Sequence, residues 1–205
     1  LMTAGLILET LNLKEIITVN PQATTVVGSK MRLRNHEKIT LKDLLKWLLV
    51  QSANDSAFAL AYHHSFTPDN FVLEMNKKAR ELEMFDTNFT NPAWFDRGDG
   101  YSTVMDLLKL VRRLRQFEDF REIVVIREDE VFSVDTRFSH KLYSTNRLFE
   151  THLAPITFGI KTGTTPLAGE CLINFFSKDD LNLITVILGS TDRYSDIENL
   201  LSWVE

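Results

Sequence analysis

The sequence predicts an α+β fold, with helices in the first part of the chain and an antiparallel sheet near its end. Three observations support this prediction. Leucines recur with helical spacing after residue 40, and strand-like segments follow one another after residue 156. The last two of these segments are joined by a tight Lys-Asp-Asp turn at 178–180. Helices and strands that are separated along the chain in this way are typical of α+β domains.

The chain opens with a helical pattern in which Leu1, Ala4, Leu8 and Leu11 share one stripe. Helices normally begin with a Ser, Thr, Asp or Asn cap, and nothing here precedes the pattern to serve as one. We therefore expect a helix whose first turn is missing. The polar and β-branched stretch 16–38 then predicts short strands and turns.

A strongly amphipathic helix is predicted to follow, with Thr40 as its N-cap. It ends at Ser52-Ala53-Asn54, which we place on a tight turn before a second helix. The apolar spacing predicts that the first of these helices buries Leu41, Leu44, Leu45, Leu48 and Leu49.

Two further helices have clear starting signals. Thr67-Pro68 begins one, with proline at the favoured first position, and Ser102-Thr103 begins the other. The apolar stretch after residue 122 predicts a hairpin that turns at 127–130. The end of the chain predicts three strands and a last helix: FGIKTG (158–163), ECLINFFS (170–177), NLITVILGS (182–190) and the helix from Thr191 to Val204.

Composition describes an ordinary globular chain and excludes several classes of function. The 205 residues are 44% hydrophobic and 25% charged, which is enough to bury a core. We expect a single domain over 1–205, with its helical part at about 40–150 and its sheet part at about 156–205. The net charge of −5, without a basic stripe, argues against a nucleic-acid or membrane-surface binder.

The remaining composition signals are negative. The apolar runs are too short to span a membrane, and no signal peptide is visible. Cys171 is the only cysteine, so no internal disulfide can form. The five histidines lack metal-ligand spacing, so we predict neither a metal nor another cofactor.

The K-T-G stretch, Lys161 to Gly163, is the first candidate for chemistry. A lysine ammonium and threonine hydroxyls are what a carboxylate needs from a binding site, one fixed charge and several donors. Gly163 removes a side chain where a ligand backbone could lie against the strand. The competing interpretation is an edge strand that a lysine protects against aggregation.

The S-x-N stretch, Ser52 to Asn54, is a second and weaker candidate. Its position between two helices lets both polar side chains point the same way. The competing interpretation is that Ser52 or Asn54 caps the helix beginning near Ser56.

Together these motifs, in this order, resemble two thirds of a known set. Serine β-lactamases and penicillin-binding proteins carry S-x-x-K, then S-x-N, then K-T-G. The segments FVLEMNKKARELEMFDTNFTNP, GYSTVMDLLKL, FREIV, STNRLF and GIKTGTTPLAGECLI further resemble D-alanyl-D-alanine carboxypeptidases, the low-molecular-weight penicillin-binding proteins. LMTAGLILE resembles the sequence that directly follows S-x-x-K in that family. The resemblance covers nearly the whole chain to about Leu188 and implies a serine β-lactamase/penicillin-binding-protein-like fold.

The resemblance implies a role for each matching residue. Ser52 would pass protons between the catalytic lysine and the leaving amine, and Asn54 would bind the substrate peptide and hold that lysine. Lys161 would attract the C-terminal carboxylate of a peptidoglycan stem peptide, with Thr162 and Thr164 hydroxyls assisting. The Thr164 N–H would be one donor of the oxyanion hole.

The chain departs from the family at its most reactive motif. None of its serines is followed by lysine three residues later, so S-x-x-K is absent. If the alignment holds, Leu1 directly follows the missing lysine, and we expect the family's first strands to be missing too. Ala93-Trp94, Thr164-Thr165 and Glu170 are smaller departures that would change substrate preference. Without a serine beside its base, acyl transfer has no nucleophile.

The prediction is therefore a serine-type D-Ala-D-Ala carboxypeptidase that is inactive as this chain stands. Its partners would be peptidoglycan stem peptides ending in D-Ala-D-Ala and β-lactams, and the family implies an extracytoplasmic location. Two alternatives remain open: a class A-like β-lactamase, and a non-catalytic relative that binds peptidoglycan through the K-T-G cleft. The class A alternative is less favoured because no E-x-x-L-N-type deacylation segment is evident.

Overall fold

The computed structural model describes residues 1–93, 95–96, 98–135 and 137–203. Trp94, Val204 at the end of the predicted last helix, and Glu205 lie outside the described residues. The elements in chain order are α1 (Met2–Thr10), β1 (Ile16–Thr18), the 3-10 helix η1 (Pro21–Thr25), β2 (Lys38–Thr40), α2 (Leu41–Val50), α3 (Asn54–Ser65), α4 (Pro68–Glu81), α5 (Val104–Leu114), α6 (Glu118–Val124), β3 (Glu128–Phe132), β4 (Ser139–Tyr143), the 3-10 helices η2 (Arg147–Glu150) and η3 (Ala154–Ile156), β5 (Thr157–Thr165), β6 (Gly169–Lys178), β7 (Leu181–Ser190) and α7 (Arg193–Ser202).

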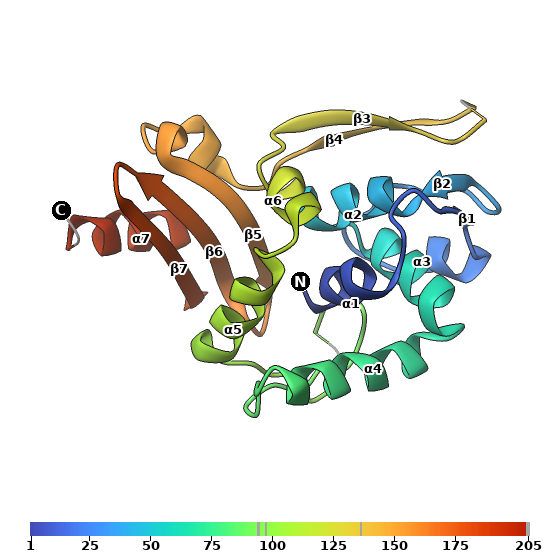
Figure 1. Cartoon of the computed structure of the whole chain (residues 1–205), viewed down its shortest axis with the longest axis horizontal. Coiled ribbons are helices and arrows are strands. Elements are labelled where there is room, and N and C mark those ends of the chain that lie inside the picture. The colour runs from blue at the N-terminus through green and yellow to red at the C-terminus, as the bar shows by residue number, and fades with distance from the viewer. Residues whose placement is uncertain (94, 97, 136, 204–205) are drawn as a thin grey trace.

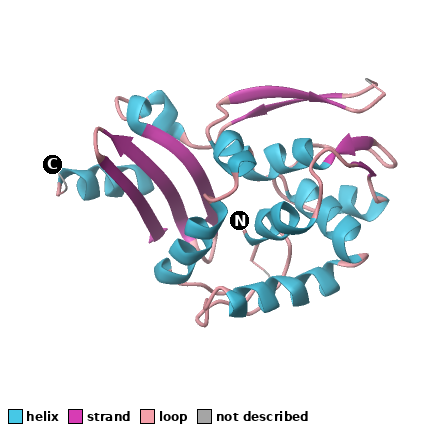
Figure 2. Ribbon diagram, in the orientation of Figure 1, coloured by secondary structure: helices cyan, strands magenta, loops and turns pink. Residues whose placement is uncertain are grey.

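The molecule has a sheet at one end and a group of helices at the other. Figure 1 shows α7 on one side of the sheet β5–β6–β7. On the other side, α5 and α6 lie between the sheet and the helices α1 to α4. Figure 2 shows the same division by secondary structure, with the hairpin β3–β4 lying over the helices. The predicted α+β fold is confirmed by this arrangement.

The three-stranded sheet is antiparallel, with β5 as one outer strand and β7 as the other. Lys161 lies opposite Ile173, and the register between β5 and β6 shifts before it, between Thr157 and Ile160. Gly159 sits at that irregularity with a φ of +72°, and an added Cβ would lie 2.2 Å from the carbonyl oxygen of Val124. Only glycine fits here, so the end of α6 and the start of β5 are held in close contact.

Apolar side chains cover both faces of this sheet. Ile160 and Ile173 belong to the main core, which also contains the inward faces of α1 to α6. The opposite face forms a smaller core in which Leu172 and Phe176 pack with Ile197 of α7. Because the outer strand β5 is held on both faces, the residues on it have fixed positions relative to the helices.

The helix starts agree with their sequence signals. The side chains of Thr40, Thr67 and Thr103 accept the backbone N–H of Asp43, Asn70 and Asp106, respectively. Each bond satisfies a donor that the first turn of a helix leaves free. All five leucines predicted for the buried face of α2 are buried.

One prediction about the elements is incomplete and one is wrong. The residues of the expected stripe on α1 do pack in or against the main core, but Met2 through Ile7 are also buried in succession, because this helix is surrounded by others. Residues 128–130 of the predicted hairpin turn lie instead within β3, and residues 118–124 form the helix α6. Acidic residues at the start of that segment favour a helix N-terminus, and the apolar run after them satisfies the pattern of a helix as well as that of a strand.

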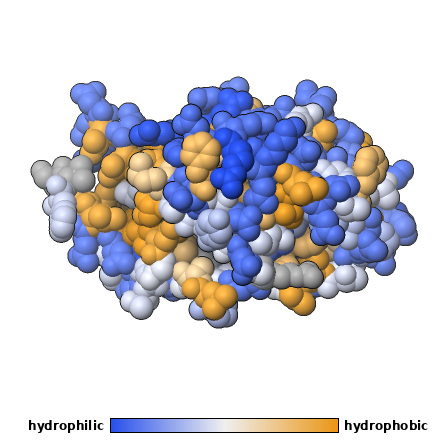
Figure 3. Space-filling model, turned by 90° about the horizontal axis from the view of Figure 1, so that it is seen from below, coloured by the Kyte–Doolittle hydropathy of each residue, from blue (hydrophilic) through white to orange (hydrophobic). Residues whose placement is uncertain are grey.

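The surface is largely hydrophilic on the face seen in Figure 3, with apolar groups gathered mainly on the side where the sheet lies. Leu181 and Leu188 of the outer strand β7 are among the exposed apolar residues. In the described part of the chain, no helix combines the length and the apolar character needed to cross a lipid bilayer.

Candidate active site

The fold brings the two sequence motifs together. Ser52 lies two residues after the end of α2, and Lys161 lies in the middle of β5, far along the chain. The Lys161 ammonium donates a hydrogen bond to the Ser52 hydroxyl, and a second one, of 2.7 Å, to the backbone oxygen of Thr162. One serine and one lysine from separate motifs therefore form a single polar centre.

The electrostatic state of this lysine is unusual. Burial, followed by the positive charge of Arg193, lowers the pKa of Lys161 to about 8. A lysine with such a pKa carries a proton at neutral pH but can release it at little cost. No carboxylate of the described residues forms an ion pair with it.

Ser52 itself occupies a strained backbone conformation. Its φ is +59°, which is uncommon for a residue other than glycine and costs free energy. α2 ends at Val50 and α3 begins at Asn54, so this residue makes the turn between two buried helices. Such strain persists only where the surroundings hold the residue in place. In this conformation the Ser52 hydroxyl points at Lys161.

Asn54 is held by a loop. Its amide nitrogen donates to the carbonyl oxygen of Val27 (2.7 Å), and its backbone N–H donates to that of Ser29 (2.7 Å). Between these two, Gly28 has a φ of +88°, and an added Cβ would meet the Asn54 amide at 2.6 Å. In the described residues, no hydrogen bond joins the Asn54 side chain to Lys161. The competing interpretation of S-x-N is not supported either, since no side chain caps α3.

The residues after Lys161 have different surroundings. The Thr162 hydroxyl is buried and bonds to the Thr145 hydroxyl (2.5 Å). A Cβ added to Gly163 would meet only Cys171, at an ordinary 3.9 Å, so the fold does not require glycine at this position. Thr164 is exposed. Gly163 and Thr164 therefore leave this part of the outer strand open to a ligand.

Arg193 is a site residue that the sequence analysis missed. It is the first residue of α7 and only 8% exposed. Its guanidinium donates to the carbonyl oxygens of Gly163 and Cys171 (2.8 Å each), to Glu170 (3.1 Å) and to the Thr164 hydroxyl. A cation at a helix N-terminus opposes the helix dipole, and that was the signal that could have identified it.

Glu170 balances part of this positive charge. It accepts hydrogen bonds from the backbone N–H and the guanidinium of Arg193, and these hold the pKa of the Glu170 carboxyl below its usual range. The charge of Glu170 therefore positions Arg193. Two cations therefore lie at this stretch of β5: Lys161, which belongs to the strand, and Arg193 of α7, which donates to the Gly163 carbonyl.

The start of α1 reaches the same place. Burial, followed by the charge of Lys161, lowers the pKa of the Leu1 amino group to about 5. The first residue of the chain thus lies within electrostatic reach of Lys161. Among the residues that the structure describes, no three His, Cys, Asp or Glu side chains are placed to hold a metal ion.

Comparison with known proteins gives a consistent result. A family model described as D-alanyl-D-alanine carboxypeptidase matches residues 1–192. The chain is 30% identical to D-alanyl-D-alanine carboxypeptidase DacF of Bacillus subtilis, over 99% of this chain and 54% of that protein. It is also 30% identical to a D-alanyl-D-alanine endopeptidase of Escherichia coli, over 100% of this chain and 67% of that protein. The chain spans about half the length of several curated relatives that it matches.

Solved structures show the same likeness. A variant of a DD-transpeptidase from Streptomyces K15 superimposes with a TM-score of 0.90 at 25% identity, covering 98% of this chain and 84% of that one. The D-alanyl-D-alanine carboxypeptidase DacD of Francisella tularensis gives a TM-score of 0.89 at 23% identity, covering 98% and 62%. The second likeness concerns the fold alone.

Proposed function

The chain belongs to the D-alanyl-D-alanine carboxypeptidase family, and on that premise we propose that the protein is a serine-type D-Ala-D-Ala carboxypeptidase of peptidoglycan stem peptides. The observation that carries the proposal is the contact between the Ser52 hydroxyl and the Lys161 ammonium. The relatives bear the names carboxypeptidase, endopeptidase and transpeptidase, so the shared chemistry is that of a DD-peptidase.

The substrate carboxylate would be bound at the outer edge of β5. Lys161 and Arg193 supply two positive charges, and the Thr164 hydroxyl is adjacent to the Arg193 guanidinium. A peptide backbone can pair with a free strand edge, and the absence of a side chain at Gly163 allows a close approach. In this arrangement the Thr164 N–H would donate to the oxyanion that forms at the scissile carbonyl.

Ser52 would carry the proton that the leaving group needs. Cleavage of the amide expels the amine of the terminal D-Ala, which must gain a proton to leave. The Ser52 hydroxyl can donate its own proton to that amine and recover one from Lys161, whose pKa of about 8 suits this exchange. Asn54, held by the Val27 carbonyl, would position the substrate peptide.

The attacking serine is the part of the mechanism that these 205 residues do not contain. No serine is followed by lysine at the third position, and the start of α1, where that motif ends in the family, lies close to Lys161. In a protein carrying S-x-x-K there, the serine would attack the D-Ala-D-Ala carbonyl, and water would later release the acyl group. The 205-residue chain alone would bind substrate without cleaving it.

Binding and cleavage can be tested separately. A diacetylated lysyl peptide ending in D-Ala-D-Ala should bind the chain in an NMR titration, and its C-terminal amide should bind about tenfold more weakly. Released D-Ala should stay at the level of a blank. Equal affinity for acid and amide would contradict the proposed carboxylate site, and covalent labelling of a serine by a fluorescent penicillin would contradict the missing nucleophile.

Adding the missing motif separates the two remaining alternatives. With an S-x-x-K segment placed before Leu1, a carboxypeptidase should release D-Ala and become labelled by penicillin, whereas a β-lactamase should turn over penicillin rapidly. A non-catalytic binder, favoured by the absence of S-x-x-K from these residues, would do neither and would keep its affinity for the peptide.

The same proposal extends to partners and location. β-Lactams would occupy the D-Ala-D-Ala site, and peptidoglycan as substrate implies a place outside the cytoplasmic membrane. A fusion of the parent protein to a reporter that is active only outside the cytoplasm should give signal; signal only from a cytoplasmic reporter would contradict this location.

A further inference from the structure

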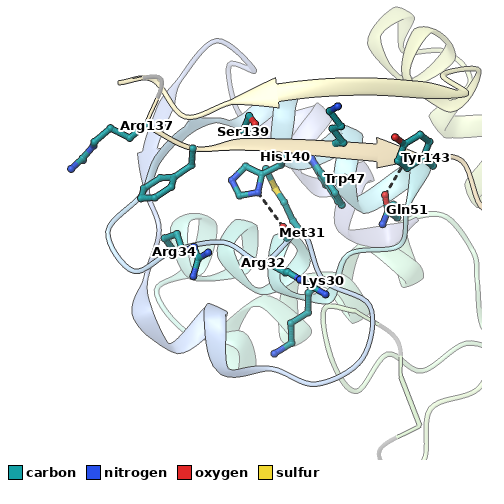
Figure 4. A pocket seen from close by; sticks show the side chains of 12 residues that line it. Lys30, Met31, Arg32, Arg34, Trp47, Gln51, Arg137, Ser139, His140 and Tyr143 are labelled. Carbon is teal, nitrogen blue, oxygen red and sulfur yellow. Dashed lines mark hydrogen bonds between the residues drawn. The ribbon is translucent and has the colours of Figure 1, made fainter.

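A groove lined by cations lies next to the candidate active site. It has a volume of about 560 Å³ and lies between the segment 30–34 and the strand β4. Figure 4 shows Met31 and His140 at its base, Gln51 and Tyr143 at one end, and cationic side chains around it. Of the described residues, no aspartate or glutamate lines the groove. We call it the basic groove.

Three of the cations, which we call the loop cations, come from alternate residues of one segment: Lys30, Arg32 and Arg34. The residues between them, Met31 and Leu33, are only 3% and 4% exposed and anchor the segment in the main core. This alternation turns every loop cation outward. The segment thus has a buried apolar side and a charged side, although it belongs to no strand or helix.

The backbone of this segment is fixed by a buried carboxylate. Asp55 accepts the N–H of Met31 (2.9 Å), Arg32 (2.8 Å) and Leu33 (3.1 Å). Arg32 has a φ of +66°, a conformation that costs free energy for a residue with a side chain. The loop cations therefore project from a rigid backbone that the fold maintains at a cost.

Unlike a group of ion-paired cations in the protein, the loop cations have no acidic partner. Lys42, Lys46, Lys78, Lys109 and Arg113 each form an ion pair with a neighbouring carboxylate. In the described part of the chain, none of the loop cations forms one. Acidic residues outnumber basic ones by 28 to 23, so a groove without a lining carboxylate is not expected from composition.

We propose that the basic groove binds a linear polyanion that carries phosphodiester groups. The three loop cations project from one rigid backbone and line the same groove, so they offer several charges to one ligand and fit a repeating charge better than a single small anion. Two of the three are arginines, whose planar guanidinium donates two parallel hydrogen bonds to the free oxygens of a phosphate. The proposal does not depend on the peptidase function, because the groove involves neither Lys161 nor Arg193.

The test uses a phosphodiester chain without bases. A fluorescent abasic oligomer of about eight phosphates should bind the 205-residue chain. A plot of the logarithm of the binding constant against the logarithm of the salt concentration should have a slope of about −2, since three cations each contribute about 0.7. Each of Lys30→Gln, Arg32→Gln and Arg34→Gln should weaken binding about threefold to tenfold, and the triple variant should bring the slope close to zero.

Matched controls keep the result specific. Arg112→Gln removes an exposed arginine from α5 and should leave the affinity unchanged. Lys161→Ala should also leave it unchanged, which separates this proposal from the peptidase function. Circular dichroism of the triple variant should match the parent and its melting temperature should not fall, because the exchanged side chains form no ion pairs.

Four outcomes would overturn the proposal. The first is no binding at low salt, and the second is an equal loss of affinity in Arg112→Gln. The third is equal or tighter binding of an oligoglutamate of the same charge, which would indicate a carboxylate ligand. The fourth is binding of oligothymidine more than about tenfold tighter than the abasic chain, which would indicate recognition of bases.

Discussion

The two groups of cations in this protein are built in opposite ways. Lys161 and Arg193 are at least partly buried and hydrogen-bonded to neighbouring protein groups, and burial lowers the pKa of Lys161. The loop cations, Lys30, Arg32 and Arg34, have no carboxylate partner, although their backbone is just as firmly held. Desolvated charges in fixed positions select one anion by geometry, whereas solvated charges attract many anions and are screened by salt. The difference predicts how each group responds to substitution.

The largest difference should appear in stability. Replacing Arg193 by Met removes four side-chain hydrogen bonds and leaves the Glu170 carboxylate with only the backbone N–H of residue 193. We expect a loss of about 3 kcal/mol in the free energy of unfolding, measured by urea denaturation. Arg34→Gln should change it by less than about 0.5 kcal/mol. Equal effects of the two substitutions would show that the contrast between the groups is wrong.

Replacing Lys161 should have a smaller effect on the free energy of unfolding, and of opposite sign. Because folding lowers its pKa to about 8, the unfolded chain binds this proton more tightly, and the charge costs stability below about pH 8. Lys161→Met should therefore raise the free energy of unfolding at pH 7 by about 1–2 kcal/mol. The gain should shrink above pH 8 and vanish near pH 10.5, where the lysine is neutral in both states. A gain that persists at high pH would show that packing, and not charge, is responsible.

Replacing Gly163 should affect the binding of the D-Ala-D-Ala peptide more than the stability of the protein. A Cβ at this position meets no atom closer than 3.9 Å, so Gly163→Ala should leave the melting temperature nearly unchanged. If a ligand backbone lies against β5, the same methyl group should weaken binding of the D-Ala-D-Ala peptide about fivefold, or about 1 kcal/mol. Unchanged affinity would mean that the ligand does not approach the strand at this residue.

The smallest effect concerns repulsion among the loop cations. Arg34→Gln should stabilise the protein by a few tenths of a kcal/mol at low salt, because it removes one of three like charges that lack partners. The gain should disappear at about 1 M salt, where such charges are screened within about 3 Å. A gain that does not depend on salt would have another cause.

Local signals in the sequence predicted much of the fold. The capping residues Thr40, Thr67 and Thr103 act within one helical turn, so the starts of α2, α4 and α5 could be predicted from neighbouring letters alone. The three strands of the sheet were predicted for the same reason, from β-branched runs and the turn at 178–180. The helix α6 was mistaken for part of a hairpin because its apolar residues satisfy both patterns.

Contacts between distant residues were harder to predict. The resemblance to a family indicated Ser52 and Lys161, and the structure brings them into contact. Arg193 belongs to no short motif and acts only because α7 packs against the sheet near Gly163. The basic groove depends in the same way on Asp55, which organises a loop some twenty residues away in sequence.

The three hydrogen bonds to Asp55 have a consequence for solvent exchange. The amides of Met31, Arg32 and Leu33 belong to no helix or strand, yet each donates to a carboxylate that is fully buried. Deuterium can replace these protons only when the segment leaves Asp55, which would expose an unpaired charge in the core. This irregular loop should therefore exchange as slowly as the helices around it, and its amides should report when the whole helical region opens.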